Sequence, residues 1–117
     1  MNWNDDEDDE DIEGYEVKDG IGIIPDGTTA IKSEAFKGSE DLISINIPKG
    51  VTRIDESAFE DCINLASITI PDSVRSIGEE MCYCCENLKS IKVPAGKGDY
   101  FKELLDDTKL AKLVVEI

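Results

Sequence analysis

The side chains best suited to chemistry in this sequence are four cysteines, Cys62, Cys82, Cys84 and Cys85. The 117 residues contain no histidine. The usual general base, the Ser-His and Cys-His nucleophile pairs and the commonest metal ligand are therefore all missing. We predict a protein that is not an enzyme, with no catalytic residue, no cofactor-binding residue and no cofactor.

The cysteines are predicted to be structural. Cys62 and Cys85 occupy equivalent positions in neighbouring segments, and small buried thiols commonly fill apolar cores. Cys82 is also predicted to point inward, while Cys84 is predicted to be the exposed thiol. Two alternatives are a zinc site built from all four thiols and a Cys62–Cys85 disulfide in an oxidising compartment. We predict no metal site.

The second group of candidate ligands is the acidic run Asp5–Asp11. Carboxylate oxygens bind Ca²⁺, but a calcium loop alternates its acids with turn-forming residues and glycine. An unbroken run of acids repels itself and is typical of a disordered, solubilising tail. We therefore predict such a tail over residues 1–14.

Charge and hydropathy exclude several classes of partner. The net charge is −15, and eight of the 27 acids lie in residues 1–13, which leaves 19 acids against 12 bases elsewhere. Nucleic-acid binding needs a cationic surface, which this composition does not provide. No apolar run approaches the length of a membrane span, so no membrane insertion is expected. Without a secretory signal, the chain as it stands is expected in the cytoplasm, or at the cell surface if a signal was removed.

A repeat in the sequence determines the secondary-structure elements that position these side chains. Pro25, Pro48, Pro71 and Pro94 are the four prolines of the chain, and each follows the previous one by 23 residues. They define the repeats 25–47, 48–70 and 71–93, with predicted caps at 15–24 and 94–117 in a single domain, 15–117. Such a fixed period is the signature of a repeat architecture.

Apolar residues keep the same period. The recurring positions are Ile31, Ile54 and Ile77; Phe36, Phe59 and Cys82; Ser39, Cys62 and Cys85; Leu42, Leu65 and Leu88; Ile45, Ile68 and Ile91; and Ile47, Ile70 and Val93. The β-branched end of each repeat alternates as a strand does, and proline then ends the strand. Because one repeat cannot bury its apolar edge alone, we expect successive repeats to stack and their strands to pair in parallel.

The two ends break the pattern. A strand is expected at residues 21–24. After Pro94, the apolar spacing of residues 96–105 predicts a short helix with Asp99 as its N-cap, and residues 113–117 predict a final strand.

The middle repeat, residues 48–70, reads Pro-Lys-Gly-Val-Thr-Arg-Ile-Asp-Glu-Ser-Ala-Phe-Glu-Asp-Cys-Ile-Asn-Leu-Ala-Ser-Ile-Thr-Ile. It resembles the BspA-type leucine-rich repeat, with V-T-x-I-G-x-x-A-F-x-x-C followed by L-x-S-I-x-I. Ser39 departs from the cysteine of this pattern and Met81-Cys82 from its Ala-Phe pair. The strand is followed by proline, without the asparagine ladder of better-known leucine-rich repeats.

This resemblance implies an α/β solenoid. The expected architecture is a right-handed leucine-rich-repeat superhelix with a parallel β-sheet on one face, short helical or irregular arcs on the other, and a C-terminal helix-strand cap. The family further implies a protein-protein interaction module or an adhesion-type protein.

The exposed face of that sheet is the predicted partner site. Its outward positions are Ser44, Asn46, Ser67, Thr69, Ser90 and Lys92. Extended faces of repeat proteins commonly bind partners. The identity of the expected protein partner is open. The alternatives are a small intracellular scaffold that self-associates as a homo-oligomer and a cysteine-based metal-binding protein.

Overall fold

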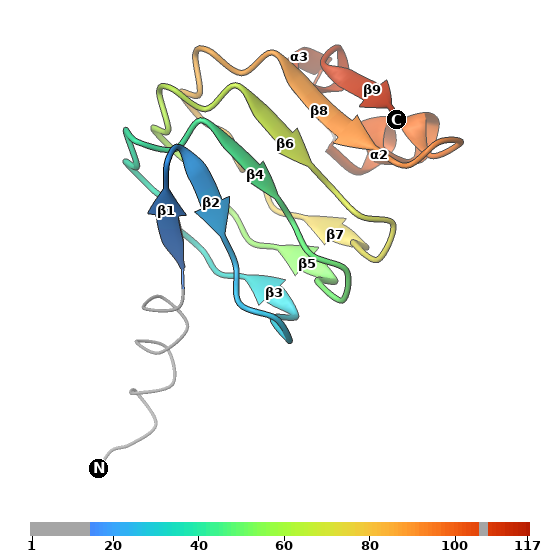
Figure 1. The fold of residues 1–117 in the computed structure, drawn as a ribbon. Coiled ribbons are helices and arrows are strands. Elements are labelled where there is room, and N and C mark those ends of the chain that lie inside the picture. The colour runs from blue at the N-terminus through green and yellow to red at the C-terminus, as the bar shows by residue number, and fades with distance from the viewer. Residues whose placement is uncertain (1–14, 106–107) are drawn as a thin grey trace.

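The strands that close each repeat form one sheet. In the computed structural model, which describes residues 15–105 and 108–117, the sheet has the order β1-β2-β4-β6-β8-β9 (Figure 1). Its members are β1 (Glu16–Lys18), β2 (Ile21–Ile23), β4 (Ser44–Asn46), β6 (Ser67–Thr69), β8 (Ser90–Val93) and β9 (Val114–Glu116). From β2 to β9 every pairing is parallel. The prediction of adjacent parallel strands is confirmed.

The register of this sheet equals the sequence period. Ile45 pairs with Ile68 and Ile68 pairs with Ile91, so equivalent residues of successive repeats lie side by side. The period even extends into the C-terminal cap, because Ile91 pairs with Val114, 23 residues further on. Each apolar column therefore meets its own copy in the next repeat.

The opposite side of each repeat carries a second parallel sheet, which the sequence did not lead us to expect. It consists of β3 (Ala30–Ile31), β5 (Arg53–Ile54) and β7 (Ser76–Ile77). The rest of each arc is made of turns, and residues 15–93 contain no helix. Main-chain bonds also link the turns of neighbouring repeats, as from Phe36 N to Ala58 O (2.8 Å) and from Phe59 N to Met81 O (2.8 Å). Of the short helical or irregular arcs that we expected, the structure has the irregular form, and its backbone ladder satisfies buried polar groups between repeats.

Asparagine side chains link successive repeats from a position ahead of the strands. Asn64 Nδ2 donates to Glu40 O (2.9 Å), and Asn87 Nδ2 donates to Ile63 O (2.6 Å). The two asparagines are equivalent residues of successive repeats and precede the strands instead of following them. Each ties its repeat to the preceding one.

The core lies between the two sheets. Leu42, Leu65 and Leu88 are all buried, as are Ile45, Ile68 and Ile91. Aromatic rings continue the layering, because the Phe36 and Phe59 rings stack with their centroids 5.6 Å apart. Burial of these columns supplies the main driving force for folding.

The N-terminal end of the sheet is covered by a hairpin. β2 confirms the strand expected near residues 21–24, and β1 pairs with it in antiparallel fashion. Asp19 and Gly20 join the two strands with φ angles of 55° and 82°. Positive φ at both central residues is typical of the type I′ turn that Asp-Gly favours.

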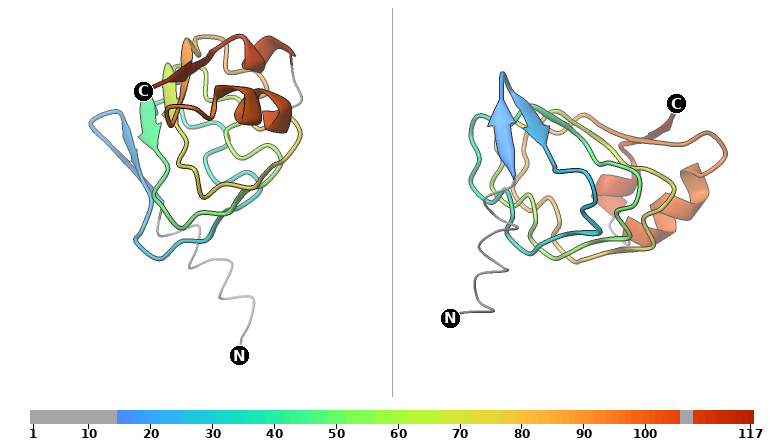
Figure 2. Two further views of the ribbon diagram at one scale, coloured as in Figure 1. Left: turned by 90° about the vertical axis from the view of Figure 1, so that its right-hand side faces the viewer. Right: turned by 60° about the horizontal axis from the view of Figure 1, so that its bottom comes forward.

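The C-terminal end is covered by α2 (Gly98–Leu105) and α3 (Thr108–Ala111), followed by β9. Figure 2 shows these helices gathered at one end of the molecule and the β1–β2 hairpin at the other. α2 begins at Gly98, so Asp99 lies inside its first turn and the predicted N-cap is wrong. The carboxylate of Glu116 takes that role, because it accepts the Gly96 and Gly98 N–H groups at 3.1 and 2.9 Å.

Among the described residues, no helix is both long and apolar enough to cross a membrane.

Candidate functional site

The predicted partner face lies on the outer side of the six-stranded sheet. We call its six residues the polar strip: Ser44, Asn46, Ser67, Thr69, Ser90 and Lys92. Pairing aligns the three serines in one row across β4, β6 and β8, and aligns Asn46, Thr69 and Lys92 in a second row. Asn46 is exposed and the other five residues are half-buried. The arrangement is two rows of hydroxyl and amide groups with one ammonium.

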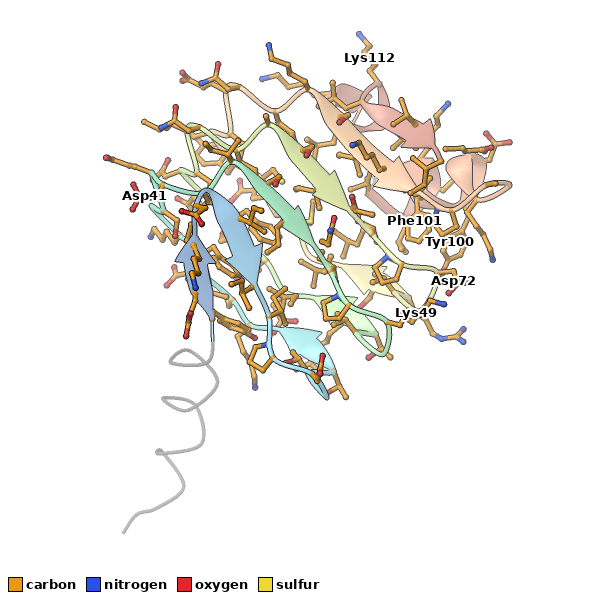
Figure 3. All side chains as sticks on the ribbon, in the orientation of Figure 1. Asp41, Lys49, Asp72, Tyr100, Phe101 and Lys112 are labelled. Atoms are coloured by element: carbon orange, nitrogen blue, oxygen red, sulfur yellow. The ribbon has the colours of Figure 1, made fainter. Side chains whose placement is uncertain are left out.

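Beside the polar strip runs a third row of equivalent residues, which changes from apolar to charged along the sheet. Ile43 is exposed at its β4 end, Ala66 is half-buried beside β6, and Lys89 is exposed beside β8. Figure 3 places Lys112 at the β9 end of the molecule and Asp41 near the other end. Lysines therefore concentrate where the sheet approaches the C-terminal helices.

Cys62 and Cys85 occupy equivalent places below the sheet. The Cys62 thiol donates to Phe36 O at 2.9 Å, and the Cys85 thiol donates to Phe59 O at 3.0 Å. The hydrogen bond with Cys85 and burial raise the pKa of Cys62 far above its ordinary value. The bond with Cys62 lowers the pKa of Cys85, but the bond with Cys82 and burial outweigh it and raise that pKa to about 12. Both groups are therefore neutral thiols at pH 7.

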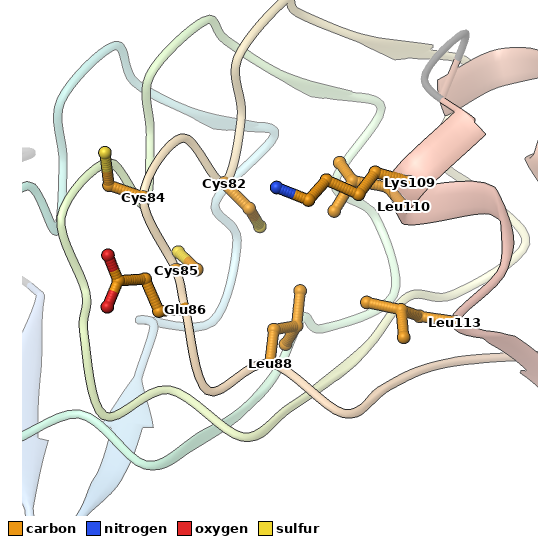
Figure 4. Close-up of a pocket in the computed structure, with 8 residues that line it drawn as sticks. All are labelled: Cys82, Cys84, Cys85, Glu86, Leu88, Lys109, Leu110 and Leu113. Carbon is orange, nitrogen blue, oxygen red and sulfur yellow. The ribbon is translucent and has the colours of Figure 1, made fainter.

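Cys82 ends the aromatic column. It follows Phe36 and Phe59 at the equivalent position of the third repeat, and it is 7% exposed, as predicted for an inward residue. A thiol is much smaller than a phenyl ring, and a pocket of about 310 Å³ opens beside it. The walls comprise Cys82, Cys84, Cys85, Glu86, Leu88, Lys109, Leu110 and Leu113 (Figure 4). We call this space the thiol pocket.

Cys84 is the exposed thiol, as predicted. Its backbone has a positive φ of 64°, as Asp61 has one repeat earlier. Desolvation and then the charge of Asp61 raise the pKa of Cys84. The surrounding acids thus disfavour the reactive thiolate form.

The alternative of a metal centre has no support in the geometry. Within residues 15–105 and 108–117, no three cysteine or carboxylate side chains converge closely enough to hold an ion. The acidic run Asp5–Asp11 and its calcium alternative lie outside the described residues.

A family model named BspA type leucine rich repeat region, with six copies, matches residues 22–116. The chain belongs to this family. The assignment agrees with the repeats that run in register from β2 to β9. BspA-type leucine-rich repeats are generally non-catalytic and generally serve protein interaction or adhesion.

No match was found among curated proteins or among solved structures. The family assignment of this BspA-type chain therefore rests on its repeats.

Sequence reasoning missed the thiol pocket. The available signals were the replacement of the column phenylalanine by Cys82 and the C-x-x-C spacing of Cys82 and Cys85. Its far wall could not be foreseen, because it depends on where α3 lies against the third repeat. Leu110 and Lys109 of α3 supply that wall.

Proposed function

We propose that this BspA-type repeat protein is a non-catalytic protein-interaction module, of the adhesion type, that binds a protein partner through the polar strip. The observation that carries the proposal is the alignment of equivalent short polar residues across β4, β6 and β8. Side chains of this size leave the strands accessible over a continuous area, as extended binding faces of repeat proteins require.

The charge along the face favours a partner of particular chemistry. Lys89 and Lys92 lie at the β8 end, whereas Ile43 lies exposed at the β4 end. A complementary partner carries acidic groups opposite the lysines and an apolar group opposite Ile43. Such complementarity contributes to specificity and to the rate of association.

We further propose the architecture on which this face depends. The chain would form one domain over residues 15–117, wound as a right-handed solenoid with repeats 25–47, 48–70 and 71–93 between two caps. Residues 1–14 would form a solubilising acidic tail. The parallel register of both sheets supports this arrangement.

The test begins with affinity capture on the intact protein, followed by identification of the retained partner. The double variant Ser67→Arg/Thr69→Arg places two bulky cations in the middle of the polar strip. We expect it to weaken partner binding at least tenfold in calorimetric titration, because it destroys the fit of a flat face.

The matched control is Thr52→Arg/Ser76→Arg. Both of these residues are exposed on the side of β5 and β7, away from the polar strip. The control should bind as the unmodified protein does, and circular dichroism should show that both variants are folded. Unchanged binding by the Ser67/Thr69 variant would contradict the proposed site.

A second candidate function is self-association as a scaffold. β9 forms the outer strand at one end of the sheet, and Val115 and Ile117 beside that edge are 45% and 66% exposed. An uncovered strand edge is a template for pairing with another chain. Light scattering at several protein concentrations distinguishes this candidate, since it requires a concentration-dependent dimer or higher oligomer.

A further inference from the structure

We propose that Cys82 and Cys85 form a thiol–disulfide site, at which a small-molecule disulfide that enters the thiol pocket oxidises the pair to an intramolecular disulfide. The thiol pocket lies under the last repeat, and none of its lining residues belongs to the polar strip. A turn joins Cys82 and Cys85, both line the pocket, and the other two thiols are less well placed.

The backbone holds the two cysteines close together. Cys85 N donates to Cys82 O at 3.1 Å, which closes a four-residue turn with Tyr83 and Cys84 at its centre. The ends of such a turn lie less than about 7 Å apart between Cα atoms, and a disulfide spans about 4.4–6.8 Å. The bridge can therefore form through side-chain rotation.

Both thiols also reach the same open space. Cys82 and Cys85 line the thiol pocket, whose volume of about 310 Å³ admits a small organic disulfide at least in part (Figure 4). Cys85 is half-buried and Cys82 is 7% exposed, so Cys85 is the sulfur that an incoming reagent meets first. Cys82 is then placed to resolve the adduct.

Cys62 is a weaker partner for Cys85, although the two occupy equivalent positions in successive repeats. It is fully buried and does not line the pocket. Its thiol already donates a hydrogen bond to Phe36 O at 2.9 Å.

Cys84 is the exposed alternative. It neighbours Cys85 in the chain, and a disulfide between adjacent residues distorts the peptide that joins them. Figure 4 shows its sulfur set apart from that of Cys82.

The chemistry consists of two exchanges. The Cys85 thiolate attacks one sulfur of the small disulfide, so that a mixed disulfide forms and one small thiolate leaves with the proton that Cys85 has lost. The Cys82 thiolate then attacks the Cys85 sulfur, which breaks the mixed disulfide and releases the second small thiol. The protein loses two protons and two electrons, and the small disulfide, which gains both, is reduced to two thiols.

The experiment treats the full chain with oxidised glutathione at mildly alkaline pH, where more thiolate is present, and then blocks the remaining thiols with iodoacetamide under denaturing conditions, because Cys62 is buried in the folded protein. We expect the intact mass to show loss of two hydrogens and two added carbamidomethyl groups. Trypsin cleaves after Arg75 and Lys89, so Cys82, Cys84 and Cys85 share one peptide and Cys62 lies in another. Tandem mass spectrometry should find carbamidomethyl on Cys84 and on Cys62.

Four serine variants complete the test. Cys82→Ser and Cys85→Ser should abolish the loss of two hydrogens, and Cys85→Ser should also abolish the glutathione adduct. Cys62→Ser and Cys84→Ser are the matched controls and should still form the bridge. The proposal is overturned if the bridge persists in Cys82→Ser, if trypsin yields two linked peptides, or if the unmodified protein gives only a stable glutathione adduct or no oxidation.

Discussion

At the scale of single residues, each side chain acts through its place in a column. Phe36 and Phe59 stack because the 23-residue period brings equivalent positions side by side. The column of rings stops at the third repeat, where Cys82 takes the place of the phenylalanine. The period made the inward direction of Cys62 and Cys82 and the exposure of Cys84 predictable from sequence. The pocket was not predictable, since a smaller residue leaves a space only if nothing else moves in to fill it.

Cys82→Phe should restore the interrupted column. The added ring would occupy part of the thiol pocket and contact Phe59, so we expect the free energy of unfolding to rise by about 1 kcal/mol, within the range of cavity-filling substitutions. Urea denaturation in the presence of a reductant measures this change. Cys82→Ala, which enlarges the pocket, should lower the stability by a similar amount. A Cys82→Phe protein less stable than the unmodified one would show that the pocket cannot accept a ring.

At the scale of elements, the strands of the large sheet could be predicted and their counterparts across the core could not. The alternation of apolar and polar residues around Ile45, Ile68 and Ile91 predicts β4, β6 and β8. β3, β5 and β7 are only two residues long, and their pairing depends on backbone groups that every residue type carries. No side-chain pattern distinguishes such a strand from an irregular arc.

The C-terminal elements depend on one carboxylate. Hydrogen bonds from Gly96 N and Gly98 N lower the pKa of Glu116 below its usual value of 4.5. A depressed folded-state pKa means that the stabilisation is fully present above the unfolded-state value and is lost as the pH falls through the folded-state value. We expect Glu116→Gln to unfold at a lower temperature at pH 7, because an amide oxygen is a weaker acceptor for a helix N-terminus.

Thermal unfolding between pH 7 and pH 3 measures this effect. The difference between the unmodified protein and Glu116→Gln should shrink as the pH falls, since protonation removes the same charge that the substitution removes. Glu103→Gln, on the exposed side of α2, is the control and should show little difference at either pH. A Glu116→Gln difference that persists unchanged at pH 3 would exclude the carboxylate as the cause.

At the scale of the whole molecule, the chain is an array of equivalent repeats. The β1–β2 hairpin lies at one end of the array, and α2, α3 and β9 lie at the other. The prolines and the Leu and Ile columns predicted the array. The C-terminal segment was predicted as a separate cap, yet β9 keeps the 23-residue register, with Ile91 opposite Val114. The segment is thus a modified repeat in which α2 and α3 take the place of the arc. These helices cover the apolar surface of the last repeat, which a further repeat would otherwise have covered.

The central claim is that equivalent residues lie opposite one another in successive repeats, and nuclear Overhauser spectroscopy on isotope-labelled protein tests it most directly. The predicted result is a set of inter-strand contacts between amide and α protons around Ser44, Ser67 and Ser90, and around Ile45, Ile68 and Ile91, all at separations close to 23 residues. Contacts that indicate antiparallel pairing, or a register displaced by one or more residues, would contradict the claim.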